Sequence, residues 1–81
     1  MRHLEQVKAI LHASLGLGKQ KLEPDTPLLG SLPELDSMAV LGLIAALEHH
    51  FNIAVDDDEI HARHFATVAS LTGFVNAKLA P

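Results

Sequence analysis

The sequence predicts an all-α protein: a four-helix bundle with a long first loop and a short third helix. Apolar residues recur at steps of three and four in several stretches, and no stretch shows the alternating pattern of a half-buried strand. Between the first two stretches, residues 16–35 contain three glycines and three prolines, which interrupt regular helices. With 81 residues, the chain is expected to form one domain over residues 1–81.

The first helix is expected to end at Gly16, because an apolar stripe stops just before this glycine. The stripe consists of Leu4, Val7, Leu11 and Leu15, with Ile10 beside it. A loop of roughly 20 residues follows, which is long for a compact domain. Five leucines are expected to hold this loop against the bundle: Leu22, Leu28, Leu29, Leu32 and Leu35.

The second helix is expected to run from about Ser37 to Phe51, with Asp36 as its N-cap. Its core-facing residues should be Val40, Leu43, Ile44, Leu47 and Phe51. A second apolar stripe, formed by Met38, Leu41 and Ala45, has the same spacing on another side of the helix and flanks Ser37. This stripe indicates an exposed docking surface, and a helix buried on two sides is the alternative.

The acidic residues 56–59 suit the first turn of a short third helix near residues 57–63. They lack the ligand spacing of a calcium-binding loop. Thr67 is expected to cap the last helix. Its inward residues should be Val68, Leu71, Val75 and Leu79, with Phe74 beside them.

Composition excludes several kinds of partner. The formal net charge is −4 and only six residues are Lys or Arg, so nucleic acid is not an expected partner. No apolar run approaches the length of a membrane span. Cysteine is absent, so the chain supplies neither disulfides nor a thiol, as fits a reducing compartment. We therefore expect a cytoplasmic monomer.

Ser37 is the residue whose position carries most chemistry. A helix start offers unpaired N–H groups and the positive end of the helix dipole, which favour a phosphate on a nearby hydroxyl. A serine hydrolase is not expected, because the Gly-x-Ser-x-Gly pattern is missing. His61 and His64 share a helical face, but no third ligand has suitable spacing, so no metal site is expected. Ser37 as a plain capping residue in an unmodified interaction module remains an alternative.

The segment Leu35-Asp36-Ser37-Met38, followed by Ala46-Leu47-Glu48 and Phe51, resembles the phosphopantetheine attachment region of acyl carrier proteins. The order of the expected elements also matches the four-helix bundle of that family. The resemblance implies that Ser37, supported by Asp36, bears 4′-phosphopantetheine transferred from coenzyme A, whose thiol holds an acyl chain as a thioester. Such a protein is a carrier and not an enzyme. It would serve fatty acid or polyketide biosynthesis and, more broadly, lipid metabolism.

The resemblance also implies partner proteins and a place for the cargo. The partners would be a phosphopantetheinyl transferase (carrier-protein synthase), an acyl- or aminoacyl-loading ligase, and downstream acyl-processing or transferase enzymes. They would dock on Met38, Leu41, Ala45 and Glu48. The core between the second helix and Ile60, Ala62 and Leu71 could open to shelter an acyl chain.

Two departures from common fatty-acid carriers bear on the cargo. Five residues, 31–35, separate Leu29-Gly30 from Asp36, where the family usually has about one. The second helix has Ala39, Gly42 and His49 where the family usually has carboxylates. A specialised, stand-alone carrier with dedicated enzymes is therefore expected, with an aminoacyl or peptidyl carrier as the alternative.

Overall fold

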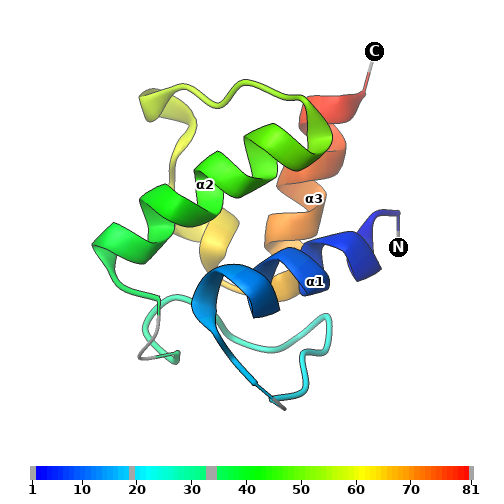
Figure 1. Cartoon of the computed structure of the whole chain (residues 1–81). Helices are drawn as coiled ribbons and strands as arrows, with labels where there is room; N and C mark the ends of the chain where they lie inside the picture. Colours follow the sequence, from blue (N-terminus) through cyan, green and yellow to red (C-terminus); the bar gives the residue numbers. More distant parts are fainter. Residues whose placement is uncertain (1, 19, 33–34, 81) are drawn as a thin grey trace.

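Three α-helices form the framework of the computed structural model: α1 (Leu4–Leu15), α2 (Ser37–Phe51) and α3 (Val68–Leu79) (Figure 1). The structure describes residues 2–18, 20–32 and 35–80. Helix α1 packs against both α2 and α3, whereas the backbones of α2 and α3 have little direct contact. The bounds predicted for the first and second helices are confirmed. No helix in these described ranges is long and apolar enough to cross a bilayer.

The core is built from one face of each helix, as the apolar spacing predicts. Its buried side chains from the three helices are Val7, Ile10, Leu11, Leu15, Leu43, Ile44, Leu47, Val68, Leu71 and Val75. Val40, Phe51 and Leu79, also predicted to face inward, are half-buried against this cluster. The predicted inward faces are therefore confirmed, with their outer members at the edge of the core.

The loop between α1 and α2 supplies hydrogen-bond acceptors to the first residues of α3. The first N–H groups of a helix lack partners within the helix. Here the Val68 and Ala69 N–H groups donate to the carbonyls of Thr26 (3.1 Å) and Pro24 (2.7 Å). Thr67 caps the same helix as predicted, because its Oγ1 accepts from the Ser70 N–H at 3.1 Å. The loop is thus tied to α3 by its backbone.

Leucine side chains also hold this loop, with one exception. Leu22, Leu28, Leu32 and Leu35 are buried as predicted, but Leu29 is 41% exposed, so its predicted anchoring role is wrong. The N–H groups of Leu28 and Leu29 pair with the Ala66 and Phe65 carbonyls, each at 2.9 Å. Leu28 directly follows the isolated bridge between Pro27 and Thr67 and is fully buried, whereas Leu29 already belongs to the turn at residues 29–31, where its side chain is partly exposed. The loop residues 33 and 34 lie outside the described residues.

The predicted short third helix is replaced by two 3-10 turns, η1 (Asp57–Glu59) and η2 (Ala62–Phe65). The prediction of a continuous helix near 57–63, and with it the count of four helices, is therefore wrong. Aspartate is a weak helix former, and an extended backbone at Ile60 lets this side chain pack against the core. Ala62, predicted to line the core, is exposed, and the buried Phe65 fills the core from η2 instead.

Candidate functional site

Ser37 is the first residue of α2, and its surroundings hold it at the surface. The buried side chain of Leu35 anchors the chain just before the helix. Asp36 then caps the helix as predicted: its Oδ1 accepts from the Ala39 N–H at 2.8 Å, and its carbonyl accepts from the Val40 N–H at 3.0 Å. Ser37 itself is exposed. The anchored backbone therefore presents its hydroxyl to solvent at a fixed place.

The electrostatics at Ser37 suit a phosphodiester. The N-terminus of α2 carries the positive end of the helix dipole, and the first turn of α2 contains no acidic side chain that would repel an added anion. The carboxylate of Asp36 is engaged with the Ala39 N–H. Exposure, dipole and the lack of acids in this turn together fit a phosphate-linked group on Ser37.

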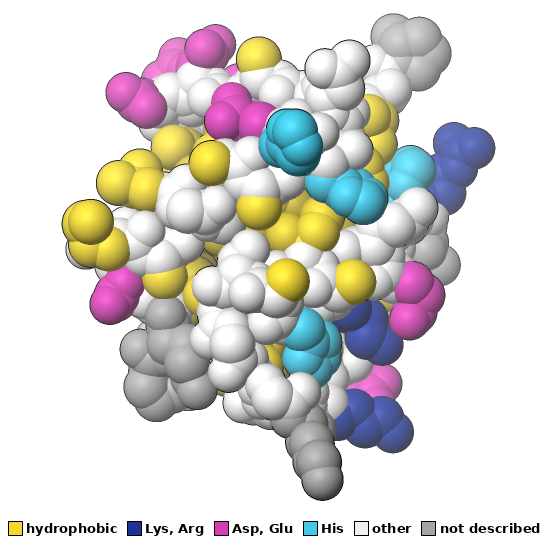
Figure 2. Space-filling view, in the orientation of Figure 1, with side chains coloured by type: hydrophobic (Ala, Val, Ile, Leu, Met, Phe, Trp, Pro, Cys, Tyr) yellow, Lys and Arg dark blue, Asp and Glu magenta, His cyan; other side chains and the backbone are white. Residues whose placement is uncertain are grey.

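An apolar surface lies beside Ser37 on the outer side of α2. Met38 is 75% exposed and Leu41 is 59% exposed, and Ala45 is exposed one turn further on. Figure 2 shows hydrophobic side chains protruding over the N-terminal half of α2. We call Met38, Leu41 and Ala45 the apolar face. Its exposure is as predicted, and the alternative of a helix buried on two sides is wrong.

Glu48 behaves differently from the apolar face with which the sequence grouped it. Its side chain is half-buried, and its Oε2 accepts a hydrogen bond from the Val55 N–H at 2.9 Å. Ala39 is half-buried, whereas Gly42 and His49 are exposed. As Glu48 is the only acid of α2, the exposed surface of this helix offers a partner no unengaged carboxylate.

Histidines gather at two places. Figure 2 shows several where the C-terminal end of α2 meets the N-terminal end of α1. The rings of His61 and His64 lie 5.6 Å apart, and His64 stacks on Phe74 at 4.4 Å between ring centroids. Burial, and then the nearby charges of Arg63 and His61, lower the pKa of His64. In the part of the chain that the structure describes, no three His, Asp or Glu residues are grouped to hold a metal ion.

An open depression of about 540 Å³ lies beside these rings. Its walls come from η1, η2 and α3, and are formed by Asp58, Glu59, His61, Arg63, His64, Phe74, Ala77 and Lys78. Ser37 and the apolar face are not among them. The depression is therefore separate from the surface around Ser37.

Two polar contacts, a hydrogen bond and an ion pair, were not predicted from the sequence. One joins Glu48 to Val55, and the other joins Lys78 to Glu59 at 2.8 Å. The spacing of Asp56 and Glu59 is that of a capping box and could have indicated the turn at η1. No local pattern links Glu59 to Lys78, which lies 19 residues further along.

A short helical bundle with an exposed serine at a capped helix start is the arrangement expected of a carrier domain. Comparisons with known proteins support this class. Residues 5–75 match the family described as the phosphopantetheine attachment site. The chain is 35% identical over 77 residues to an acyl carrier protein of Thermosynechococcus vestitus, covering 95% of this chain and 91% of that one. It is 30% identical over 77 residues to an acyl carrier protein of Helicobacter hepaticus, covering 95% and 97%.

A solved structure is similar over nearly the whole chain. It is the solution NMR structure of a holo acyl carrier protein from Nitrosomonas europaea, with a TM-score of 0.89, 53% identity and 98% coverage of both chains. The chain therefore belongs to the acyl carrier protein family. Its function is to carry acyl groups, and its prosthetic group is phosphopantetheine.

Proposed function

We propose that Ser37 is the residue to which 4′-phosphopantetheine is attached. The observation that carries this proposal is the exposed position of Ser37 on the first turn of α2, next to the engaged Asp36 cap. The family match over residues 5–75 includes this segment. Ser31, an exposed serine of the preceding loop, lies outside any helix.

The chemistry of the carrier is divided between the group and the chain. The bound group supplies the thiol on which an acyl chain is held as a thioester. The chain supplies the Ser37 oxygen for the phosphodiester and a capped helix start that sets where the arm begins. No general base is needed in the chain, because partner enzymes perform the transfers. The protein thus acts by presentation, which raises the effective concentration of its cargo at each partner enzyme, and not by catalysis.

We propose that partner enzymes dock on the apolar face beside Ser37. Met38 and Leu41 expose large apolar side chains next to the attachment residue, and the only carboxylate of α2 is engaged with Val55. Partners that rely on a basic patch would find few charges to bind on this helix. The expected partners are a phosphopantetheinyl transferase, a loading ligase and acyl-processing enzymes. Their docking sites for this helix should be apolar. We infer a specialised carrier with dedicated enzymes.

Intact-mass measurement tests the attachment residue. The protein is incubated with coenzyme A, Mg²⁺ and a broad-specificity phosphopantetheinyl transferase. We expect the native chain and the Ser31→Ala control to gain the mass of one phosphopantetheine, and Ser37→Ala to gain none. Modification of Ser37→Ala would overturn the assignment.

A further inference from the structure

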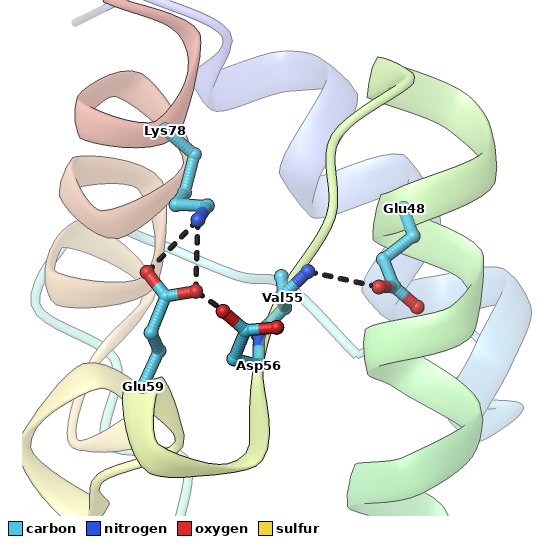
Figure 3. Close-up of polar contacts among 5 residues, drawn as sticks. All are labelled: Glu48, Val55, Asp56, Glu59 and Lys78. Carbon is cyan, nitrogen blue, oxygen red and sulfur yellow. Dashed lines mark hydrogen bonds and ion pairs between the residues drawn. The ribbon is translucent and has the colours of Figure 1, made fainter.

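The segment of residues 52–60, which we call the strap, runs from the C-cap of α2 through η1 and lies between α2 and α3 (Figure 3). These two helices pack on α1 and have little direct backbone contact with each other. The strap side chains Val55 and Ile60 are half-buried against the core cluster. The strap therefore closes part of the space that the two helices leave between them.

Two neighbouring amides of the strap are held by carboxylates. The Val55 N–H donates to Glu48 Oε2 of α2 at 2.9 Å. The next amide, the Asp56 N–H, donates to Glu59 Oε1 at 3.0 Å. Hydrogen bonds to charged groups are stronger than neutral ones, so these two amides are well anchored.

The second carboxylate is itself fixed to α3. Lys78 Nζ donates to both Glu59 oxygens at 2.8 Å. The pKa of Glu59 is lowered by the Asp56 amide and then by Lys78, which agrees with a carboxylate engaged on two sides. We call this series of polar contacts the relay (Figure 3). Glu48 of α2 binds the Val55 amide, the adjacent Asp56 amide binds Glu59, and Glu59 binds Lys78 of α3.

We propose that this relay is a latch that sets how often the strap opens and exposes the core between α2 and α3. Apart from the relay, the strap is held by the Ile53 N–H, which donates to the Glu48 carbonyl at 3.2 Å, and by the partial burial of Val55 and Ile60. Releasing either end of the relay therefore lets the strap beyond Ile53 swing outward more often. The inference extends the proposed function, since the opened space is apolar and suits the acyl chain of a loaded carrier. The latch then regulates exchange of that chain between the interior and solvent.

Hydrogen exchange of the apo protein tests the latch without any cargo. Lys78→Met removes the donor of an ion pair between elements, and Lys8→Met removes the donor of the ion pair with Glu5 inside α1. The two lysines are matched in exposure, at 24% and 23% of their side-chain surface. Glu48→Ala releases the other end of the latch.

We expect Lys78→Met and Glu48→Ala to speed exchange at the Val55 and Asp56 amides about ten- to a hundredfold, in line with the loss of one charge-assisted hydrogen bond. Lys8→Met should leave these amides unchanged, and Lys78→Arg should restore slow exchange. Equal exchange in Lys78→Met and Lys8→Met would overturn the latch. So would faster exchange spread evenly over all amides, the Leu11 amide of α1 included, because the tie would then be one of general stability.

A second measurement links the latch to the cargo. The methyl resonances of Leu47 and Leu71 are compared between the holo protein and its octanoyl thioester. The octanoyl chain should give these methyl groups one chemical shift when it lies inside the core and another when it lies in solvent. We expect exchange between these two shifts to be faster in Lys78→Met than in Lys8→Met. Equal rates would refute the role of the latch in cargo exchange. Failure to gain the arm at all, seen by mass, would instead refute the attachment at Ser37 and leave the amide exchange result standing.

Discussion

Asp36 Oδ1 accepts a hydrogen bond from the Ala39 N–H at 2.8 Å across the first turn of α2. This bond spans Ser37 and fixes the turn on which its hydroxyl is presented. Leu35, buried just before the cap, fixes the incoming chain. The serine therefore does not have to cap the helix, and its hydroxyl can serve chemistry while its neighbour serves structure.

The division of roles between Asp36 and Ser37 predicts opposite effects of two alanine substitutions. Asp36→Ala should lower the free energy of unfolding by about 1 kcal/mol, because an N-cap is lost. Ser37→Ala should leave the free energy of unfolding nearly unchanged and abolish attachment of the arm. Urea unfolding followed by circular dichroism measures both. A larger loss for Ser37→Ala than for Asp36→Ala would show that the serine is the structural residue.

Exposure predicts that Leu41 and Leu43 differ sharply although they lie two residues apart. Leu41 is 59% exposed and Leu43 is fully buried. Leu41→Glu should preserve the melting temperature and weaken the interaction with a phosphopantetheinyl transferase, raising its KM about tenfold if Leu41 is a docking hot spot. Leu43→Ala should lower the free energy of unfolding by about 2–5 kcal/mol. A collapse of the melting temperature in Leu41→Glu would remove the docking argument.

Helices were predictable wherever apolar spacing and a cap agreed. The step of three and four, with Asp36 or Thr67 at the start, placed α2 and α3. The acidic segment before Ile60 has no such spacing, and tertiary contacts decide its form. The extended backbone at Ile60 lets its side chain pack, half-buried, against the core, and Lys78 pairs with Glu59. These contacts join residues far apart in the sequence, so no local pattern reveals them.

The site was predictable to the same degree. The Asp36 cap, the helix start at Ser37 and the exposure of Met38 and Leu41 follow from a capping residue and a helix period. Glu48 shares that period with the apolar face but turns its carboxylate to Val55, seven residues further on. Its partner is a backbone amide, which leaves no mark in the sequence. A face can therefore be placed from spacing, while the engagement of one polar side chain on it needs the structure.

The lack of free acids on α2 predicts weak activity with fatty-acid enzymes that dock through basic patches. Adding acids by Ala39→Asp, Gly42→Glu and His49→Glu should raise elongation in a reconstituted synthase, and more so at low salt. A Cβ added at Gly42 meets no atom within 4 Å, and this residue is exposed, so the fold accepts a glutamate there.

Gly42→Ala is the matched control for Gly42→Glu. It raises helix propensity by about 1 kcal/mol and adds no charge. It should leave elongation unchanged. Full elongation activity of the unaltered carrier would contradict the inferred specialisation.

Two groups predict the pH dependence of stability. The pKa of Glu59 is lowered by the Asp56 amide and by Lys78, so its contribution is present above its unfolded pKa and is lost as pH falls through its folded pKa. The pKa of His64 is lowered by burial, and then by Arg63 and His61. As pH falls, His64 therefore takes up a proton in the unfolded chain before it does so in the folded chain. The free energy of unfolding starts to decrease once the pH drops below the pKa of histidine in the unfolded chain, which is a milder pH than that at which Glu59 acts.

Thermal unfolding from neutral to acidic pH tests both windows. Glu59→Gln should remove the loss at low pH, and His64→Gln should remove the loss at milder pH. Asp58, His61 and Arg63 line the same depression as these two groups and remain in both variants, so they serve as a common background. Identical pH profiles of the native chain and both variants would show that neither group is coupled to folding.

The attachment of phosphopantetheine to Ser37 is the central claim, and localising the arm on the chain tests it most directly. The holo protein is digested and its peptides are fragmented in a mass spectrometer, with all serines, including Ser14, Ser31 and Ser70, followed in the same experiment. We predict that the whole added mass is on the peptide containing Ser37 and that fragmentation assigns it to that residue. An arm found on any other residue would contradict the account. So would a protein that carries no arm after complete treatment with coenzyme A and the phosphopantetheinyl transferase.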